Sequence, residues 1–120
     1  MTARSREEES RERRKLLQEE LDRYLSLLKS QPDPPERILL FGSMTGDENE
    51  VGLWSDLDLV VVQSTSLRFL DRIKALITLL QPRVGLDLLV YTPEEFEQMK
   101  AQRPFFQQEI LAKGKVLYER

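Results

Sequence analysis

The sequence predicts an α/β (α+β) fold, in which one small mixed β-sheet is flanked by helices. Short apolar runs of strand length, rich in Val, Leu and Ile, alternate with longer segments whose apolar residues recur at helical spacing. The length of 120 residues suits one compact domain with one hydrophobic core. We therefore expect residues 1–120 to form a single domain, with its elements in the order α-β-β-α-β-α-α-β.

A charged helix over about residues 5–30 is the first expected element. Its first half, "ARSREEESRERRK", mixes charges of both signs, and an apolar stripe at helical spacing follows it: Leu17, Leu21, Tyr24, Leu25 and Leu28. The prolines of "QPDPP" end the helix, because they remove backbone donors and fix φ. The alternative, a basic arm for nucleic acid, is disfavoured because four glutamates in the first half offset its arginines.

Two strands and a helix are expected after the proline turn. "RILLF" (37–41) and "DLDLVVV" (56–62) have the composition of buried strands, and a long polar connection, which can hold one helical turn, joins them. Apolar residues at helical spacing then predict a helix over 67–80.

The last third of the chain carries a third strand and a clear helix start. "VGLDLLVYT" (84–92) predicts another buried strand, and Thr92, Pro93 and Glu95 occupy the N-cap, N1 and N3 positions of the helix that follows. "PFFQQEILAKG" predicts one more short helix that stops at Gly114, and "KVLYE" predicts a final edge strand.

The composition narrows the chemistry that the chain can perform. It contains no cysteine and no histidine, which excludes disulfides, zinc–thiolate sites, cysteine nucleophiles and Ser-His-Asp catalysis within the chain. A metal ion would therefore have oxygen ligands, which favours hard cations such as Mg²⁺ or Mn²⁺.

The charge balance and the hydropathy pattern bear on partners and location. With 18 basic and 21 acidic side chains the net charge is −3, whereas broad nucleic-acid binding needs a basic surface. No apolar stretch approaches the roughly 20 residues of a membrane span, and the charged N-terminus has no signal-peptide pattern. We expect a cytoplasmic protein that does not bind membranes, and the acidic balance disfavours nucleic acid as a partner, although modification of RNA or DNA ends stays an open alternative.

Three aspartates interrupt the predicted strands. Asp56 and Asp58 stand at the start of one strand, and Asp87 lies within the next. Residues i and i+2 of a strand point to the same face, so Asp56 and Asp58 are expected to project together. If the two strands are neighbours, one register brings all three carboxylates into a cluster.

Such a cluster is unfavourable by itself, because like charges and burial both oppose ionisation. A divalent cation removes that cost, and Mg²⁺ keeps coordination positions open for water and substrate phosphates. The three aspartates together therefore predict a metal site for a phosphate-bearing ligand. The structural alternative, in which each aspartate separately caps backbone donors or pairs with an arginine, stays open.

Gly42 and Ser43 directly follow the first predicted strand. A glycine lets a ligand approach the backbone closely, and the free N–H groups of a helical turn form a phosphate site. Gly-Ser after a strand is by itself only a turn. Followed by two strands that carry aspartates, it predicts a phosphate-binding turn.

The sequence "LLFGS", a polar connection, "SDLDLVVV" and then "VGLDLLVY" resembles the minimal nucleotidyltransferases of the DNA polymerase β-like superfamily. The shared pattern is an apolar strand, Gly-Ser, a spacer, Asp-x-Asp and a third Asp on a later strand, and it covers roughly Ile38 to Tyr91. Many members carry a basic residue directly after Gly-Ser, where this chain has Met44, and the spacer is slightly longer here.

The resemblance implies the polymerase β-like fold and the transfer of a nucleoside monophosphate, with AMP from ATP expected, to an acceptor hydroxyl with release of pyrophosphate. It implies that Gly42 and Ser43 hold the triphosphate and that Asp56 and Asp58 bind the bridging metal. Asp87 would share a second metal and help to deprotonate the acceptor. The catalytic and metal-binding residues would thus be the three aspartates, with Mg²⁺ (or Mn²⁺) as cofactor.

Two functions of different classes follow from these residues. In the first, the chain is an enzyme whose acceptor lies on a partner, because small members of the family often act as antitoxins to a helical, HEPN-type toxin and some adenylylate it. In the second, the chain is a catalytically inert binding module that neutralises its partner by direct contact. The three intact carboxylates favour the enzyme.

Overall fold

The computed structural model describes residues 5–45 and 56–120. Its elements in chain order are α1 (Arg6–Lys29), β1 (Arg37–Phe41), a 3₁₀ turn η1 (Gly42–Thr45), β2 (Leu57–Val62), α2 (Phe69–Leu80), β3 (Leu86–Tyr91), α3 (Pro93–Gln102), a π-helical segment η3 (Phe106–Leu111) and β4 (Lys115–Glu119). Most of the polar connection expected before β2, residues 46–55, lies outside the described residues. The predicted element order is confirmed, with η1 as the helical turn after β1.

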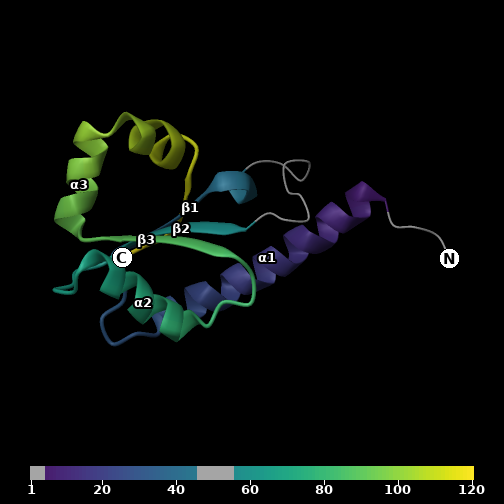
Figure 1. The fold of residues 1–120 in the computed structure, drawn as a ribbon, viewed down its shortest axis with the longest axis horizontal. Coiled ribbons are helices and arrows are strands. Elements are labelled where there is room, and N and C mark those ends of the chain that lie inside the picture. Colours follow the sequence, from purple (N-terminus) through teal and green to yellow (C-terminus); the bar gives the residue numbers. More distant parts are fainter. Residues whose placement is uncertain (1–4, 46–55) are drawn as a thin grey trace.

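The four strands form one mixed sheet with the order β3-β2-β1-β4. β1 pairs antiparallel with β2 and with β4, whereas β2 and β3 are parallel and are joined through α2. Figure 1 shows the sheet edge-on between two layers of helix, with α1 and α2 on one side and α3 on the other. The predicted fold class, a small mixed sheet flanked by helices, is confirmed.

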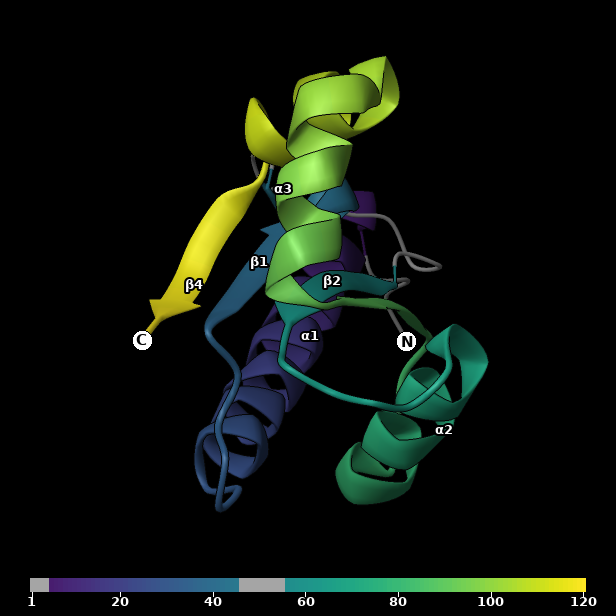
Figure 2. The same cartoon turned by 90° about the vertical axis from the view of Figure 1, so that its left-hand side faces the viewer.

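Each face of the sheet packs against its own cluster of apolar side chains. The face under α1 and α2 holds the larger cluster, which includes Leu17, Tyr24, Ile38, Leu57, Leu59 and Leu80. The face under α3 and η3 holds a smaller one: Leu39, Val60, Val62, Phe96, Phe106 and Ile110. Figure 2 shows α3 above the strands, β4 at the left-hand edge of the sheet, α1 behind the sheet and α2 at the lower right. Strand side chains alternate between faces, so β2 is apolar on both faces except at its start.

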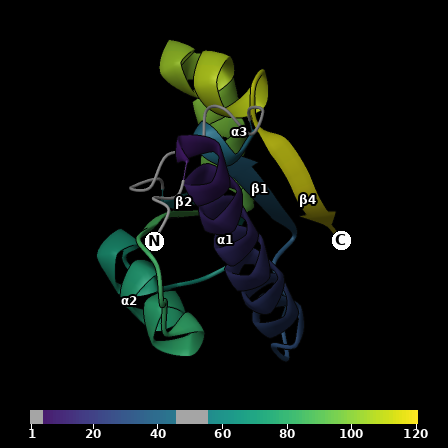
Figure 3. The same ribbon diagram turned by 90° about the vertical axis from the view of Figure 1, so that its right-hand side faces the viewer.

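Helix α1 positions the N-terminal part of the chain along the sheet. Its start is capped by the Ser5 side chain, which accepts a hydrogen bond of 3.1 Å from the backbone N–H of Glu8. The predicted apolar stripe is buried against the sheet at Leu17, Leu21, Tyr24 and Leu28. Figure 3 shows α1 in front of the strands, with α2 on one side of it and β4 on the other. None of the helices that the structure describes is long and apolar enough to cross a membrane.

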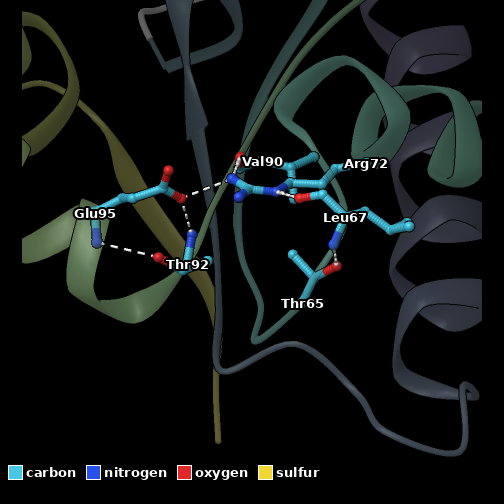
Figure 4. A network of polar contacts seen from close by, with 6 residues as sticks. All are labelled: Thr65, Leu67, Arg72, Val90, Thr92 and Glu95. Atoms are coloured by element: carbon cyan, nitrogen blue, oxygen red, sulfur yellow. Dashed lines mark hydrogen bonds and ion pairs between the residues drawn. The ribbon is translucent and has the colours of Figure 1, made fainter.

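A network around Arg72 joins α2, β3 and α3 (Figure 4). Its guanidinium donates to Glu95 Oε1 at 2.6 Å and to the carbonyl oxygens of Val90 and Leu67. Glu95 in turn accepts from the backbone N–H of Thr92, whose hydroxyl accepts from the Glu95 N–H, so the predicted capping box is formed. The start of α3 is thereby fixed to the parallel edge of the sheet.

Two element boundaries differ from the predicted ones for local reasons. Helix α2 begins at Phe69 rather than at Leu67, because the Leu67 N–H donates to the Thr65 hydroxyl and its carbonyl accepts from Arg72. The last predicted helix is a π-helix, in which the Ala112 N–H donates to the carbonyl of Gln107, five residues earlier. It ends at Leu111, with Ala112 as its C-cap, three residues before the predicted stop at Gly114, where an added Cβ would collide with the Ile110 carbonyl.

Candidate active site

Asp58 of β2 and Asp87 of β3 stand side by side at the start of the parallel strand pair. The register pairs them directly, so their side chains leave the sheet on the same face. By alternation this is the face that carries Val60 and Val62, away from α1 and α2. The two strands are therefore neighbours, as the predicted cluster requires, and they bring two of its three carboxylates together.

The environment of Asp58 opposes its ionisation. Burial raises the pKa of Asp58 to about 7, and a side-chain hydrogen bond with Asp87 and the negative charges of Asp87 and Asp56 act in the same direction. A cation bound beside this carboxyl group would offset the repulsion and favour its ionised form. Such a perturbed acid at the start of a central strand marks a candidate functional site.

Gly42 brings the start of η1 against Asp58. Its φ is +78°, a conformation that side chains disfavour, and an added Cβ would collide with the Asp58 carboxylate. Ser43 follows within η1, and its side chain lies outside what the structure describes. Met44 is buried in the larger core cluster with 4% exposure, so the position directly after Gly-Ser adds an apolar anchor rather than a charge.

Asp56 immediately precedes β2 and faces a different partner. Its Oδ1 lies 4.0 Å from Arg13 Nη2 of α1, and its side chain is 49% exposed. The missing side chain of Gly85, just before β3, leaves the space that the Asp56 carboxylate occupies. The Leu57 N–H donates to the Gly85 carbonyl at 3.0 Å, which extends the parallel pairing to this point. Asp56 therefore stands beside the Asp58–Asp87 pair, close enough for its charge to raise the pKa of Asp58.

Sequence reasoning missed two of these residues, Arg13 and Gly85. Arg13 lies four residues before Leu17, so helical spacing places it on the line of the buried stripe of α1. Gly85 directly precedes the strand that carries Asp87. The available signals were the helical spacing of Arg13 and the glycine before the strand at Gly85. Neither signal indicates a functional site until the packing of the elements is known.

The donor set fits a hard divalent cation. All three candidate ligands are carboxylates, the type of ligand that Mg²⁺ and Mn²⁺ prefer, and Gly42 keeps the space beside Asp58 free of a side chain. In the part of the chain that the structure describes, no three acidic side chains are arranged so that they could hold a metal ion. Joint binding would require the half-exposed Asp56 to turn from Arg13 toward Asp58 and Asp87.

Comparison with known proteins places the chain in a family. The family model described as "Polymerase beta, Nucleotidyltransferase" matches residues 19–120, which include all three aspartates and Gly42. No curated protein sequence gives a significant match.

Solved structures share the fold at low sequence identity. A protein from Sulfolobus solfataricus, provisionally assigned as a nucleotidyltransferase, has a TM-score of 0.56 at 19% identity over 99% of this chain and 91% of its own. A chain from a toxin–antitoxin structure with AMP-PNP has a TM-score of 0.53 at 20% identity over 82% of this chain and 73% of its own. A mutant of the toxin–antitoxin pair MntA–HpeT gives a TM-score of 0.52 at 20% identity over 83% and 72%.

Proposed function

The chain belongs to the polymerase β family of nucleotidyltransferases, and on that premise we propose that it transfers AMP from ATP to an acceptor hydroxyl, with Mg²⁺ or Mn²⁺ as cofactor. The observation that carries the proposal is the in-register pair of Asp58 and Asp87, with the pKa of Asp58 raised to about 7. If Asp58 and Asp87 served only the stability of the fold, we would expect hydrogen-bond donors beside them. Instead, the fold places like charges together.

In the proposed reaction the acceptor oxygen attacks the α-phosphorus of ATP. The bond from that phosphorus to the α,β-bridging oxygen breaks, pyrophosphate leaves, and the acceptor proton passes to Asp87. Asp56 and Asp58 would hold the cation, and Gly42 and Ser43 would hold the triphosphate. The cation, when bound, supplies positive charge to the attacking and leaving oxygens. The protein supplies position and electrostatic stabilisation, the usual contributions in phosphoryl transfer.

We further propose that the acceptor lies on a partner protein, a helical HEPN-type toxin, and that the chain is its antitoxin. Two of the structural neighbours come from toxin–antitoxin structures, one of them with AMP-PNP. The second candidate function, an inert module that neutralises the same partner by contact alone, would need neither the Asp58–Asp87 pair nor a nucleotide.

Label transfer from ATP tests the enzyme against the inert module. The purified protein is incubated with Mg²⁺, ATP labelled at the α-phosphate, and a lysate of its host. Label should move to a discrete acceptor, and Asp58→Ala should lower the rate by about a thousandfold or more, since it removes a ligand of the reacting centre. The matched control is Asp71→Ala, an exposed aspartate of α2 away from the site. No transfer together with no Mg²⁺-dependent ATP binding would contradict the enzyme and leave the binding module.

A further inference from the structure

We propose that Arg13 of α1 is a triphosphate-binding residue of this site, and that in the nucleotide-free protein it acts as the counter-ion of Asp56. The inference rests on the proposed function, because it assigns Arg13 to the nucleotide of that reaction. It adds a cation that the sequence pattern of the site does not contain.

The position of Arg13 follows from helical geometry. The buried stripe of α1 runs through Leu17, Leu21, Tyr24 and Leu28, and Arg13 stands one turn before its first member. Its side chain is only 19% exposed, while Arg11 and Glu12 beside it are exposed. Arg13 therefore lies on the side of α1 that packs on the sheet, near the end of the sheet where β2 begins.

The contact of Arg13 with Asp56 has the character of an exchangeable pair. The separation of 4.0 Å and the 49% exposure of Asp56 indicate a weak attraction. This ion pair links α1 to Asp56, one of the three aspartates of the site. A stronger anion near Asp56 could displace the carboxylate, because a guanidinium presents several N–H donors in a plane that suits phosphate oxygens.

The charge of the substrate gives the reason for such a residue. A triphosphate carries about four negative charges, and a bound divalent cation neutralises only part of them. The position after Gly42 and Ser43 cannot contribute a cation, because Met44 is buried in the core. Arg13 supplies a cation at the same edge of the sheet from a different element. Its transfer from Asp56 to a phosphate would free Asp56 to join Asp58 and Asp87.

This role makes two predictions of opposite sign. Removing Arg13 should raise the affinity for a divalent cation in the absence of nucleotide, because Asp56 loses its competing partner and the site loses a positive charge. The same change should weaken nucleotide binding, because a charge-assisted hydrogen bond to phosphate is lost. A residue that only ties α1 to the sheet would move both affinities in the same direction or neither.

The experiment measures both affinities on the full chain. Mn²⁺ binding without nucleotide is followed by electron paramagnetic resonance, and nucleotide binding is measured by calorimetry with an ATP analogue that has a methylene between the α- and β-phosphates. The variants are Arg13→Gln, Arg13→Lys and, as the matched control, Arg11→Gln. Thermal melting of each variant checks that it is folded.

We expect Arg13→Gln to bind Mn²⁺ about threefold more tightly and the analogue about tenfold more weakly, with Arg13→Lys between it and the wild type and Arg11→Gln unchanged. Equal affinities for wild type and Arg13→Gln, or parallel changes in both, would overturn the role of Arg13. A wild-type chain that binds the analogue with Mn²⁺ but transfers no label would overturn the proposed reaction. The two affinities of the Arg13 variants would still test the role of Arg13 in binding. A wild type that binds neither would overturn both.

Discussion

Two carboxylates in the chain, Glu20 and Asp58, are treated in opposite ways by the fold. Glu20 on α1 is 4% exposed and accepts hydrogen bonds from Arg23 Nε at 2.7 Å, from the Tyr24 hydroxyl at 3.0 Å and from the Arg83 N–H at 2.6 Å. These donors, the Arg23 side chain above all, lower the pKa of Glu20 to about 2. Asp58 is instead half-buried beside two other carboxylates, and its pKa is raised to about 7.

The difference shows which carboxylate is structural and which is kept for a ligand. Glu20 is the acceptor in a network that fixes α1 to the end of α2, because Arg23 also donates to the carbonyls of Leu80 and Gln81. Glu20 makes these hydrogen bonds with groups of the protein itself, so they need no ligand. The neighbours that act on Asp58 raise its pKa, so a cation from outside would favour its ionised form.

The largest effect on stability is expected from Glu20→Ala. The substitution removes the acceptor for a buried hydroxyl and for a partly buried guanidinium, so it should lower the free energy of unfolding by about 3 kcal/mol at pH 7. Urea denaturation of Glu20→Ala and of the exposed control Glu19→Ala measures the difference. A loss for Glu20→Ala no greater than for the control would mean that the network does not stabilise the fold.

The pH dependence of that loss has a definite sign. The pKa of Glu20 is lowered in the folded protein, so its ionisation stabilises the fold above its ordinary pKa of 4.5. The stabilisation is lost as the pH falls from 4.5 toward about 2. The gap between wild type and Glu20→Ala should therefore narrow over this range.

A smaller effect of opposite sign is expected from Asp58→Asn. Ionisation of Asp58 opposes folding, because its pKa is raised from 3.8 to about 7. Its contribution is thus most favourable below pH 3.8 and is lost as the pH rises to 7. Without divalent cation, Asp58→Asn should be more stable than wild type by about 1–2 kcal/mol at pH 8, with the advantage fading as the pH falls toward 4.

Thermal melting between pH 4 and pH 8 measures this advantage, with Asp71→Asn as the control. Addition of Mg²⁺ should then raise the melting temperature of the wild type and leave that of Asp58→Asn unchanged. A variant less stable than wild type at pH 8 without cation would show that Asp58 serves the fold, as Glu20 does, and would remove the main support for the metal site.

The fold could be predicted from the sequence because its patterns are local. The apolar stripe of α1, the apolar strands and the Thr92–Glu95 capping box are each contained in a short segment, and all are found in the structure. The pairing of Asp58 with Asp87 also followed, since parallel strands in register place matching residues side by side. The proposed roles of these residues stay predictions.

The two networks around α1 could not be predicted, because they depend on how elements pack rather than on spacing along one of them. Glu20 lies beside the apolar stripe and has the composition of an exposed helical residue, yet the N–H of Arg83, 63 residues later, donates to it. Arg13 has the same ambiguity. It lies within a charged segment that predicted only a solvated helix, and the packing of α1 on the sheet brings it to Asp56.

Glu95 represents an intermediate case, and the smallest effect is expected there. It is 40% exposed, and its pKa is lowered chiefly by the hydrogen bond from the Thr92 N–H, with a further contribution from Arg72. Glu95→Gln keeps a side-chain oxygen for the Thr92 N–H but loses the charge that attracts Arg72. Because solvent screens this pair, the cost should be only about 0.5–1 kcal/mol.

The matched control is Glu97→Gln on the same helix, whose carboxylate lies 3.6 Å from Lys100 and is 64% exposed. Urea denaturation should place Glu95→Gln between this control and Glu20→Ala. The order Glu20, Glu95, Glu97 would show that carboxylates stabilise this chain in proportion to the donors that the fold supplies to them. Asp58, which receives few, would then be set apart by its opposite sign. A cost for Glu95→Gln equal to that of Glu20→Ala would break this relation, because exposure would no longer separate the two.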